Sequence, residues 1–266
     1  MGRTARSLRE KWAADDVAFG VWAALACPFA VDLYASPDVD YVCVDQQHGI
    51  VDYQDMVGMM RAAEAGGSVP LTRVPGNQAW IIGKALDAGA QGVVVPLVST
   101  PEEAAAAVAA CRYPPDGVRS FGPVRASVTM RARDVGTLGG EVLCFVMIET
   151  RQGVENAERI AAVPGLDGIY IGPADLALGL GLAPDLDKAD PEHVAAVRRI
   201  LAACRGAGIV AGIQCGSGAS ARRHADMGFR LVTFAKDSSV LESAMRRELE
   251  AAAGETLAAA AAKGYT

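Results

Sequence analysis

The chain has 266 residues, and 51% of them are hydrophobic, which is enough to bury a full core in one large barrel or in two smaller domains. Its formal net charge of −6 at pH 7 excludes a typical nucleic-acid binder, because such proteins present a basic face to the phosphate backbone. Small-molecule chemistry fits better. We expect one domain over residues 1–266, with residues 1–16 as an N-terminal extension and residues 238–266 as a C-terminal helical tail.

The cysteines and the first residues indicate where the protein works. Neither the charged first 16 residues nor any later stretch has an apolar run long enough to act as a secretory leader or to span a membrane. The six cysteines lie mostly in apolar contexts and form no Cys-x-x-Cys pair: Cys27, Cys43, Cys111, Cys144, Cys204 and Cys215. This pattern predicts reduced structural thiols and a cytoplasmic location.

Short runs rich in Val, Ile and Phe alternate with longer stretches rich in Ala, Arg and Glu. Eight of these runs are predicted strands: Phe19–Leu25, Tyr41–Asp45, Pro70–Val74, Gly92–Val98, Cys144–Glu149, Gly168–Gly172, Ile209–Gln214 and Leu231–Ala235. Eight parallel strands with crossover helices define the (β/α)8 TIM barrel, whose usual size is about 250 residues. The chain is therefore predicted to be an α/β protein with a (β/α)8 barrel.

The connection between the fourth and fifth predicted strands holds the clearest helix signal and the longest irregular segment. Thr100-Pro101-Glu102-Glu103 combines a hydroxyl cap, a proline at the first helical position and a glutamate at the third. The helix ends before Tyr113. Residues 113–140 are rich in Pro, Gly and Arg, and long loops in compact domains are usually functional or mobile. We interpret this segment as an active-site loop.

The chain after the eighth predicted strand has high helix propensity. Apolar residues recur there at helical spacing: Val240, Leu241, Ala244, Met245 and Leu249. An alanine-rich end follows Gly254. We expect this helix to dock on another subunit.

Polar side chains follow three of the predicted strands. Asp45-Gln46-Gln47-His48 ends the second strand, Glu149 ends the fifth, and Asp175 comes shortly after the sixth. Because the carboxyl ends of parallel strands meet on one face, these residues are expected to converge. A histidine with at least two carboxylates indicates metal-assisted acid/base chemistry. The alternative for each acid is a simple helix cap.

These residues belong to six motifs through which the chain resembles the HpcH/HpaI family of metal-dependent class II pyruvate aldolases. The motifs are Val44-Asp45-x-x-His48-Gly49, Thr72-Arg73-Val74-Pro75, Leu86-Asp87-Ala88-Gly89-Ala90, Arg112-Tyr113-Pro114-Pro115-x-Gly117-x-Arg119, Ile148-Glu149-Thr150-Arg151 and Ile171-Gly172-Pro173-Ala174-Asp175-Leu176. The resemblance runs from Phe19 to about Met245. It implies a barrel lyase that reversibly cleaves 4-hydroxy-2-oxo acids to pyruvate, or a close 2-oxo acid, and an aldehyde. Related members also decarboxylate oxaloacetate, so this activity is a further hypothesis.

The resemblance also implies a metal site at Glu149 and Asp175. Two carboxylates leave coordination positions open for water and substrate, which suits Mg²⁺ or Mn²⁺, with Co²⁺, Ni²⁺ and Zn²⁺ as alternatives. The ion would act as a Lewis acid on pyruvate and its enolate. In the family, the segment matching Gly172-Pro173-Ala174-Asp175 receives the pyruvate carboxylate, and backbone N–H groups at a helix start suit an anion. The local sequence alone fits a plain strand-to-helix turn equally well.

The acid/base residues implied by the resemblance are His48 and its neighbours. Neutral imidazole accepts a proton near pH 7, so His48 is the candidate general base that removes the substrate hydroxyl proton. Arg73 offers fixed donors to the developing oxyanion, and its alternative is a surface ion pair. Asp45 is expected to hydrogen-bond His48. In the family, an acid matching Asp87 raises the basicity of this histidine, in some cases from a neighbouring subunit.

The other two histidines, His193 and His224, lie in helix-like contexts without a strand-end acid, and we interpret both as structural.

Two residues depart from the commonest family pattern. Gln47 stands where many members have Glu, so one negative charge is missing, although an amide still holds a metal-bound water by hydrogen bonding. Met147 stands where Gln is common, and a thioether cannot donate a hydrogen bond, which favours a less polar aldehyde. The segments Arg119–Pro123 and Cys215–Gly218 are expected to shape the aldehyde pocket.

Three alternatives to this reading stay open. The glycine-rich stretch Cys215–Ser220 follows the seventh strand, where many barrels bind phosphate, and would suit a phosphorylated substrate. Lys236, at the end of the eighth strand, would form a Schiff base in a class I aldolase. The third is a metal-dependent keto-acid binding protein, which would need no base.

The resemblance also implies a homo-oligomer, because family members assemble as hexamers, often by exchanging the last helix.

Overall fold

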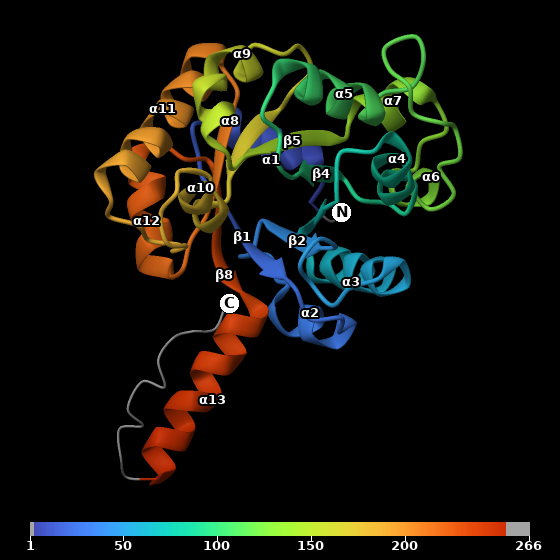
Figure 1. Ribbon diagram of the computed structural model, residues 1–266. Coiled ribbons are helices and arrows are strands. Elements are labelled where there is room, and N and C mark those ends of the chain that lie inside the picture. The colour runs from blue at the N-terminus through green and yellow to red at the C-terminus, as the bar shows by residue number, and fades with distance from the viewer. Residues whose placement is uncertain (1–2, 254–266) are drawn as a thin grey trace.

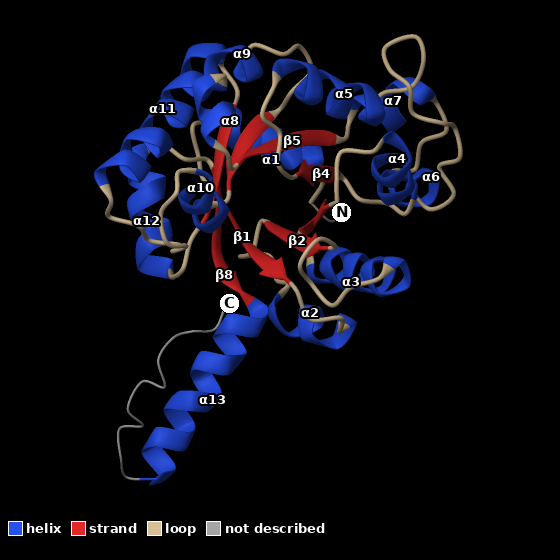
Figure 2. Cartoon of the chain, in the orientation of Figure 1, coloured by secondary structure: helices blue, strands red, loops and turns tan. Residues whose placement is uncertain are grey.

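The structure is a computed structural model that describes residues 3–253. Eight parallel strands close into a barrel in sequence order, with β8 paired to β1 (Figure 2). The strands are β1 Ala18–Ala23, β2 Tyr41–Asp45, β3 Val69–Arg73, β4 Gly92–Val95, β5 Leu143–Ile148, β6 Gly168–Ile171, β7 Val210–Gln214 and β8 Leu231–Lys236. The predicted (β/α)8 barrel and all eight predicted strands are therefore confirmed.

Most strand ends lie within one or two residues of their predicted positions, and β4 differs most. It was expected to reach Val98 but ends at Val95. Pro96 has no N–H to donate to the ladder, and Leu97 has a positive φ of 56°. The Leu97 N–H instead bonds a side chain at the carboxyl end of β5, so the early end of β4 contributes to the site described below.

The helices surround the barrel (Figure 1). They are α1 Ala5–Ala13, α2 Pro28–Tyr34, α3 Tyr53–Gly66, α4 Ala79–Asp87, α5 Pro101–Cys111, α6 Ala126–Thr129, α7 Val135–Gly140, α8 Arg151–Glu155, α9 Ala157–Ala161, α10 Pro173–Gly179, α11 Pro191–Ala207, α12 Gly218–Met227 and α13 Asp237–Ala253. Thr100 accepts a hydrogen bond from the Glu103 N–H, which confirms the predicted start of α5. No helix within residues 3–253 is long and apolar enough to cross a bilayer.

The first 16 residues were predicted to be an extension, but α1 closes the amino end of the barrel. Ala5 and Leu8 are only 2% and 1% exposed and pack into the cluster that fills the barrel interior. The Ala5 N–H donates to Gln91 Oε1, and the Trp12 indole donates to the Arg230 carbonyl, both of which lie just before strands. The apolar spacing of positions 5, 8 and 12 is helical and was the signal for this role.

The segment 113–140 lies at the same, amino-terminal end. It joins α5 to β5, and a helix-to-strand connection in this fold reaches the amino ends of the strands. Tyr113, Ala126 and Leu138 form a small cluster of their own. Within one chain, the interpretation of this segment as an active-site loop is therefore wrong.

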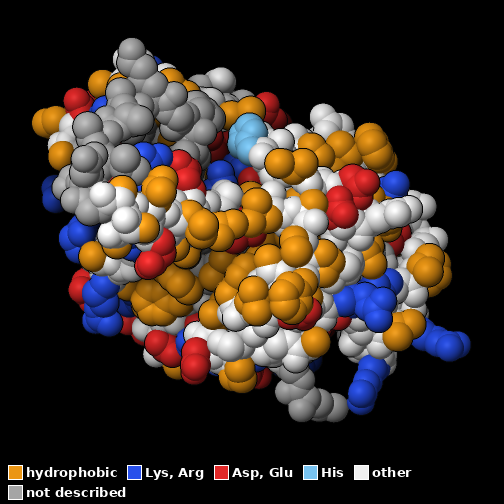
Figure 3. Space-filling view, turned by 90° about the horizontal axis from the view of Figure 1, so that it is seen from below, with side chains coloured by type: hydrophobic (Ala, Val, Ile, Leu, Met, Phe, Trp, Pro, Cys, Tyr) orange, Lys and Arg blue, Asp and Glu red, His pale blue; other side chains and the backbone are white. Residues whose placement is uncertain are grey.

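The predicted tail helix is present as α13, which projects away from the barrel (Figure 1). Four apolar residues of α13 are between 53% and 62% exposed: Val240, Leu241, Met245 and Leu249. Hydrophobic side chains also gather on the face seen in Figure 3. In α2, Phe29 and Leu33 are exposed as well. The alanine-rich end after Gly254 lies outside the described residues.

Candidate active site

A cavity of about 320 Å³ lies at the carboxyl ends of the strands. Seven of the predicted site residues line it: Asp45, His48, Arg73, Gly172, Pro173, Ala174 and Asp175. The remaining lining residues are Trp22, Met147, Tyr170, Leu186, Gln214 and Lys236. The strand ends thus bring together predicted site residues that are up to 130 positions apart, as the three polar strand exits predicted.

Asp45 and Arg73 form a buried, bidentate ion pair across β2 and β3. Arg73 Nε lies 2.9 Å from Asp45 Oδ1, and Nη2 lies 2.6 Å from Oδ2. Burial acts to raise the pKa of Asp45, but the hydrogen bonds and charge of Arg73 outweigh it, so that this pKa lies below its ordinary value. The guanidinium also lies 5.1 Å from the centre of the Trp22 ring. Arg73 is therefore held in one orientation at the pocket wall.

The predicted contact between Asp45 and His48 exists only through the backbone. Asp45 Oδ1 accepts the N–H groups of Gln47 and His48 at 3.1 and 3.2 Å. Among the described contacts, none joins Asp45 to the imidazole, so the expectation that it holds the ring tautomer is wrong. Asp45 instead fixes the loop that carries His48. A Cβ at Gly49 would overlap the Asp45 carbonyl, so this turn needs glycine.

Asp87 does not reach His48 within the chain. It ends α4, and its carboxylate accepts a 2.7 Å hydrogen bond from Arg119 Nη2. Burial raises the pKa of Asp87 despite this partner. His48 itself is exposed at the pocket. The family role of Asp87 therefore requires another subunit.

Glu149 and Asp175 lie together at the ends of β5 and β6. Glu149 is 2% exposed, and its Oε2 accepts the Leu97 N–H at 3.0 Å. Its Oε1 is buried without a hydrogen-bond partner among the described residues. Burial, followed by the charge of Asp175, raises the pKa of Glu149 to about 7. An unmet buried carboxylate oxygen beside a second acid is costly unless a cation compensates it.

These two acids fit a divalent ion with open coordination positions. Among residues 3–253, no group of three or more His, Cys, Asp or Glu is placed to hold a metal, so water and substrate would supply the other ligands. A Cβ at Gly172 would overlap Glu149 Oε1, so only glycine leaves room for that oxygen in this position. Asp175 lies in the first turn of α10, which begins with Pro173.

The floor of the pocket is a set of interior side chains that the sequence analysis did not single out. The rings of Trp22 and Tyr170 stack with centres 5.3 Å apart. The Tyr170 and Tyr41 hydroxyls both bond Thr233 Oγ1, at 2.6 and 2.7 Å. Burial raises the pKa of both tyrosines far above the ordinary value, so they stay neutral. The alternation of side chains along the strands, which turns every second residue into the barrel, was the available signal.

The two departures from the family pattern have different surroundings. Met147 lines the pocket with its thioether, as expected for a less polar wall. Gln47 is not part of the lining, and its Oε1 is buried without a hydrogen-bond partner among the described residues. Its expected role in holding a metal-bound water, and with it a part in substrate binding, is therefore not apparent within one chain.

The chain is similar to known proteins over almost its whole length. A sequence model of the HpcH/HpaI aldolase/citrate lyase family matches residues 18–244. The chain belongs to this family. A hydroxypyruvate/pyruvate aldolase of Rhizorhabdus wittichii is 38% identical over 240 residues, which cover 90% of this chain and 96% of that protein. A 5-keto-4-deoxy-D-glucarate aldolase of Citrobacter koseri is 34% identical, covering 90% and 93%.

A solved HpcH/HpaI family structure from Burkholderia cenocepacia has a TM-score of 0.87 at 37% identity. It covers 93% of this chain, and 99% of that chain is matched. The resemblance inferred from the six motifs is confirmed. The family is one of class II aldolases and generally depends on a divalent metal.

The segments Arg119–Pro123 and Cys215–Gly218 were expected to shape the aldehyde pocket, and the structure places them as follows. Residues 119–123 lie at the amino end of the barrel, away from the pocket lining. After β7, Ser217 caps α12 and Ser220 Oγ donates to Asp187 at 3.1 Å. Asp187 also pairs with Arg223, so the serine and the arginine of this turn are already bound to a carboxylate, and the structure does not support the phosphorylated-substrate alternative there.

The two remaining histidines have backbone partners. His193 Nε2 lies 3.0 Å from the Pro173 carbonyl, and His224 Nδ1 lies 2.9 Å from the Ser220 carbonyl. Burial lowers the pKa of His224. These contacts fit structural roles for both in the HpcH/HpaI fold.

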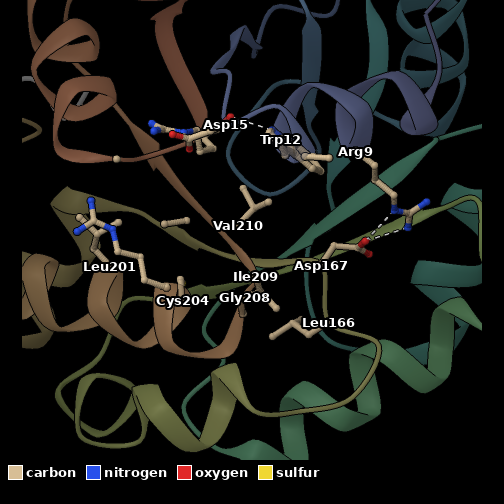
Figure 4. Close-up of a pocket in the computed structure, with 15 residues that line it drawn as sticks. Arg9, Trp12, Asp15, Leu166, Asp167, Leu201, Cys204, Gly208, Ile209 and Val210 are labelled. Carbon is tan, nitrogen blue, oxygen red and sulfur yellow. Dashed lines mark hydrogen bonds and ion pairs between the residues drawn. The ribbon is translucent and has the colours of Figure 1, made fainter.

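A larger cavity of about 580 Å³ lies at the opposite end of the barrel, beside α1 (Figure 4). Its charged side chains have partners: Arg9 pairs with Asp167 at 2.8 Å, and Arg230 pairs with Asp15 at 2.7 Å. The Arg205 guanidinium donates to the Met227 carbonyl. None of the predicted site residues lines this cavity, which lies away from the face where barrels of this kind carry their chemistry.

Proposed function

We propose that the protein is a class II aldolase that reversibly cleaves 4-hydroxy-2-oxo acids to pyruvate, or a close 2-oxo acid, and an aldehyde. The observation that carries this proposal is the buried Glu149, whose Oε1 has no hydrogen-bond partner among the described residues and which lies beside Asp175. Asp175 lines the pocket together with His48 and Arg73. The names of the similar aldolases support the same reaction class.

Glu149 and Asp175 would hold the divalent ion, for which Mg²⁺ or Mn²⁺ fits the hard oxygen donors best. A metal bound there would supply a Lewis acid for the ketone and carboxylate oxygens of the 2-oxo acid. The turn Gly172–Asp175 lines the same pocket, and we place the substrate carboxylate against it.

His48 and Arg73 carry the acid/base part of the proposal. His48 takes the proton of the C4 hydroxyl, the C3–C4 bond breaks, and its electron pair stays with the departing pyruvate enolate, which is then protonated at C3. Arg73 uses Nε and Nη2 on Asp45, and Nη1, which has no partner among residues 3–253, would donate to the developing oxyanion. Because Asp45 fixes both the Arg73 side chain and the His48 loop, it acts as a positioning residue.

Release of pyruvate from a racemic 4-hydroxy-2-oxo acid tests this function. We expect EDTA to abolish release, Mg²⁺ or Mn²⁺ to restore it, and borohydride to trap no adduct in the presence of pyruvate. Activity that ignores EDTA but is trapped by borohydride would move the chemistry to a lysine such as Lys236. Saturable pyruvate binding without any turnover would leave a keto-acid binding protein. A parallel assay with oxaloacetate tests decarboxylation through the same enolate.

We also propose a cytoplasmic homo-oligomer, with the family hexamer as the expected form. All six cysteines are free, which suits a reducing compartment. The exposed apolar stripe of α13 lacks a covering partner among the described residues of the chain and suits burial against a second copy. Light scattering on the purified protein distinguishes a hexamer from a monomer.

A further inference from the structure

A bulge in β8 turns Lys236 into the active-site pocket. Along β1 and β8 the paired residues are Gly20 with Thr233, then Val21 with Ala235 and Trp22 with Lys236. The register shifts by one residue at this point. In an uninterrupted strand, side chains alternate, and position 236 would face the surrounding helices if position 233 faced the interior.

The contacts of these residues show the effect of the shift. Thr233 faces the interior, because its hydroxyl bonds Tyr41 and Tyr170 there. Trp22 belongs to the interior cluster and lines the pocket, and its strand partner Lys236 lines the same pocket. Bulges re-aim side chains next to active sites in this way.

Lys236 brings a charge that none of the described residues neutralises. Among residues 3–253, its ammonium makes no ion pair or hydrogen bond. The other cation of the pocket, Arg73, is already paired with Asp45. Glu149 and Asp175 are committed to the proposed metal site. The pocket therefore has one cation available to an anionic group of the substrate.

The position of Lys236 assigns that group to the aldehyde half of the substrate. The proposed metal and carboxylate sites lie after β5 and β6, whereas His48 follows β2. In the closed barrel β1 lies between β2 and β8, so a chain extending past His48 runs across Trp22 toward Lys236. The carbon chain beyond C4 of the substrate lies on this side, because His48 contacts the C4 hydroxyl.

Resting on the proposed aldolase function, we infer that Lys236 is a specificity residue that selects aldehydes carrying a carboxylate. The full substrates would then be 4-hydroxy-2-oxo dicarboxylic acids, with one carboxylate at the Gly172–Asp175 turn and the other at Lys236. A lysine ammonium binds a carboxylate through a charge-assisted hydrogen bond in a partly desolvated pocket. No covalent bond to Lys236 is formed in this role.

Competing aldehydes in the addition direction test the inference. With pyruvate and metal present, kcat/KM is measured for succinic semialdehyde and for the isosteric, uncharged 4-methylpentanal, and again for glyoxylate and glycolaldehyde. We expect the wild-type protein to prefer the carboxylated member of at least one pair. In Lys236→Met that preference should fall on the order of 10- to 100-fold, which matches the loss of one charge-assisted hydrogen bond, and Lys236→Arg should restore most of it.

Lys84→Met is the matched control, because it removes the same charge from an exposed lysine that lies over the Tyr53 ring outside the pocket. Its preference should stay within about twofold of wild type, since exposed charges are screened. An unchanged preference in Lys236→Met, or equal loss with both aldehydes of a pair, would overturn the inference while leaving the aldolase function intact. Failure of the wild-type protein with every aldehyde would overturn the aldolase function itself, and the inference with it.

Discussion

The two ends of the barrel differ in whether their charged side chains have ion-pair or hydrogen-bond partners. The cavity at the amino end has about 580 Å³, and each of its charged side chains meets an opposite charge or a backbone carbonyl. The pocket at the carboxyl end has about 320 Å³, yet it borders a carboxylate oxygen without a partner and contains a lysine without one among the described residues. Cavity size would select the amino end, whereas charged groups without partners select the carboxyl end, where we propose the active site.

The difference follows from the topology of the chain. At the amino end, α1 covers the barrel interior. Its Arg9 side chain donates hydrogen bonds to Asp167 and to nearby backbone carbonyls. At the carboxyl end, polar residues directly follow several strands and so lie on one face of the barrel. Burying such a polar side chain without a hydrogen-bond partner costs free energy. Such a cost is tolerated where a metal or substrate removes it on binding.

Removing either acid of the proposed metal site should have the largest effect on function. We expect Glu149→Ala or Asp175→Ala to lose measurable Mg²⁺ or Mn²⁺ binding and to lower pyruvate release by about three orders of magnitude or more, because Lewis-acid stabilisation accounts for several kcal/mol. Calorimetric metal titration and the pyruvate assay measure the two losses. Asp167→Asn, at the other end of the barrel, is the control and should keep both metal binding and turnover. Turnover at the wild-type rate by either metal-site variant would contradict the assignment.

Removing Arg73 should separate catalysis from metal binding. In Arg73→Ala we expect kcat to fall by about 100- to 1000-fold, as for the loss of a preorganised oxyanion donor, while metal affinity changes little. Arg73→Lys should rescue only part of the rate, because lysine lacks the fork that binds Asp45 at two points. A fall in metal affinity as large as the fall in kcat would place Arg73 in the metal site instead.

The raised pKa of Glu149 predicts how pH acts on metal binding. Its pKa is about 7 in the folded, metal-free protein, against an ordinary value of 4.5. The proton must leave before a metal binds, so affinity should be about tenfold lower at pH 6 than at pH 8. Titration calorimetry in two buffers of different ionisation enthalpy measures both the affinity and the proton released. Equal affinity at the two pH values would show that Glu149 is already ionised at pH 6.

The same shift predicts the stability of the metal-free protein. Below about pH 4.5 the folded and unfolded chains both hold the proton, so the stabilising contribution is fully present. As pH rises toward 7, the unfolded chain loses the proton first, and this contribution to the free energy of unfolding is lost. Added metal should therefore raise Tm more at pH 8 than at pH 5.5, and Glu149→Gln should remove this dependence on pH.

The sequence predicted the barrel and much of the site because both depend on local patterns. Val-rich runs predict buried strands wherever they pair, and an acid directly after such a run lies at the carboxyl face by topology alone, as Glu149 does. The group that such an acid binds is harder to predict from local patterns. Asp45 was expected at the imidazole of His48 but binds Arg73 and two backbone N–H groups, and that choice depends on the path of the loop, which the strand pattern does not specify.

The inward direction of Lys236 was also beyond prediction, because it depends on one extra residue in β8. A bulge changes the face of every later side chain in the strand, and no pattern in Leu231–Lys236 marks it. The cover at the amino end was predictable in principle, since positions 5, 8 and 12 share a helical face. It was missed because the charged residues around them outnumber the apolar ones.

Truncating the cover at the amino end should affect stability and leave chemistry almost unchanged. Leu8 is 1% exposed inside the barrel cluster, so Leu8→Ala is expected to lower the free energy of unfolding by about 2–4 kcal/mol. Leu241→Ala, on the exposed face of α13, is a control that should cost far less in the separated chain. Chemical denaturation measures both changes, and kcat for pyruvate release at 25 °C should stay close to wild type in Leu8→Ala. If kcat instead fell in proportion to stability, the two ends of the barrel would be coupled, and the division between a stabilising end and a reactive end would not hold for this protein.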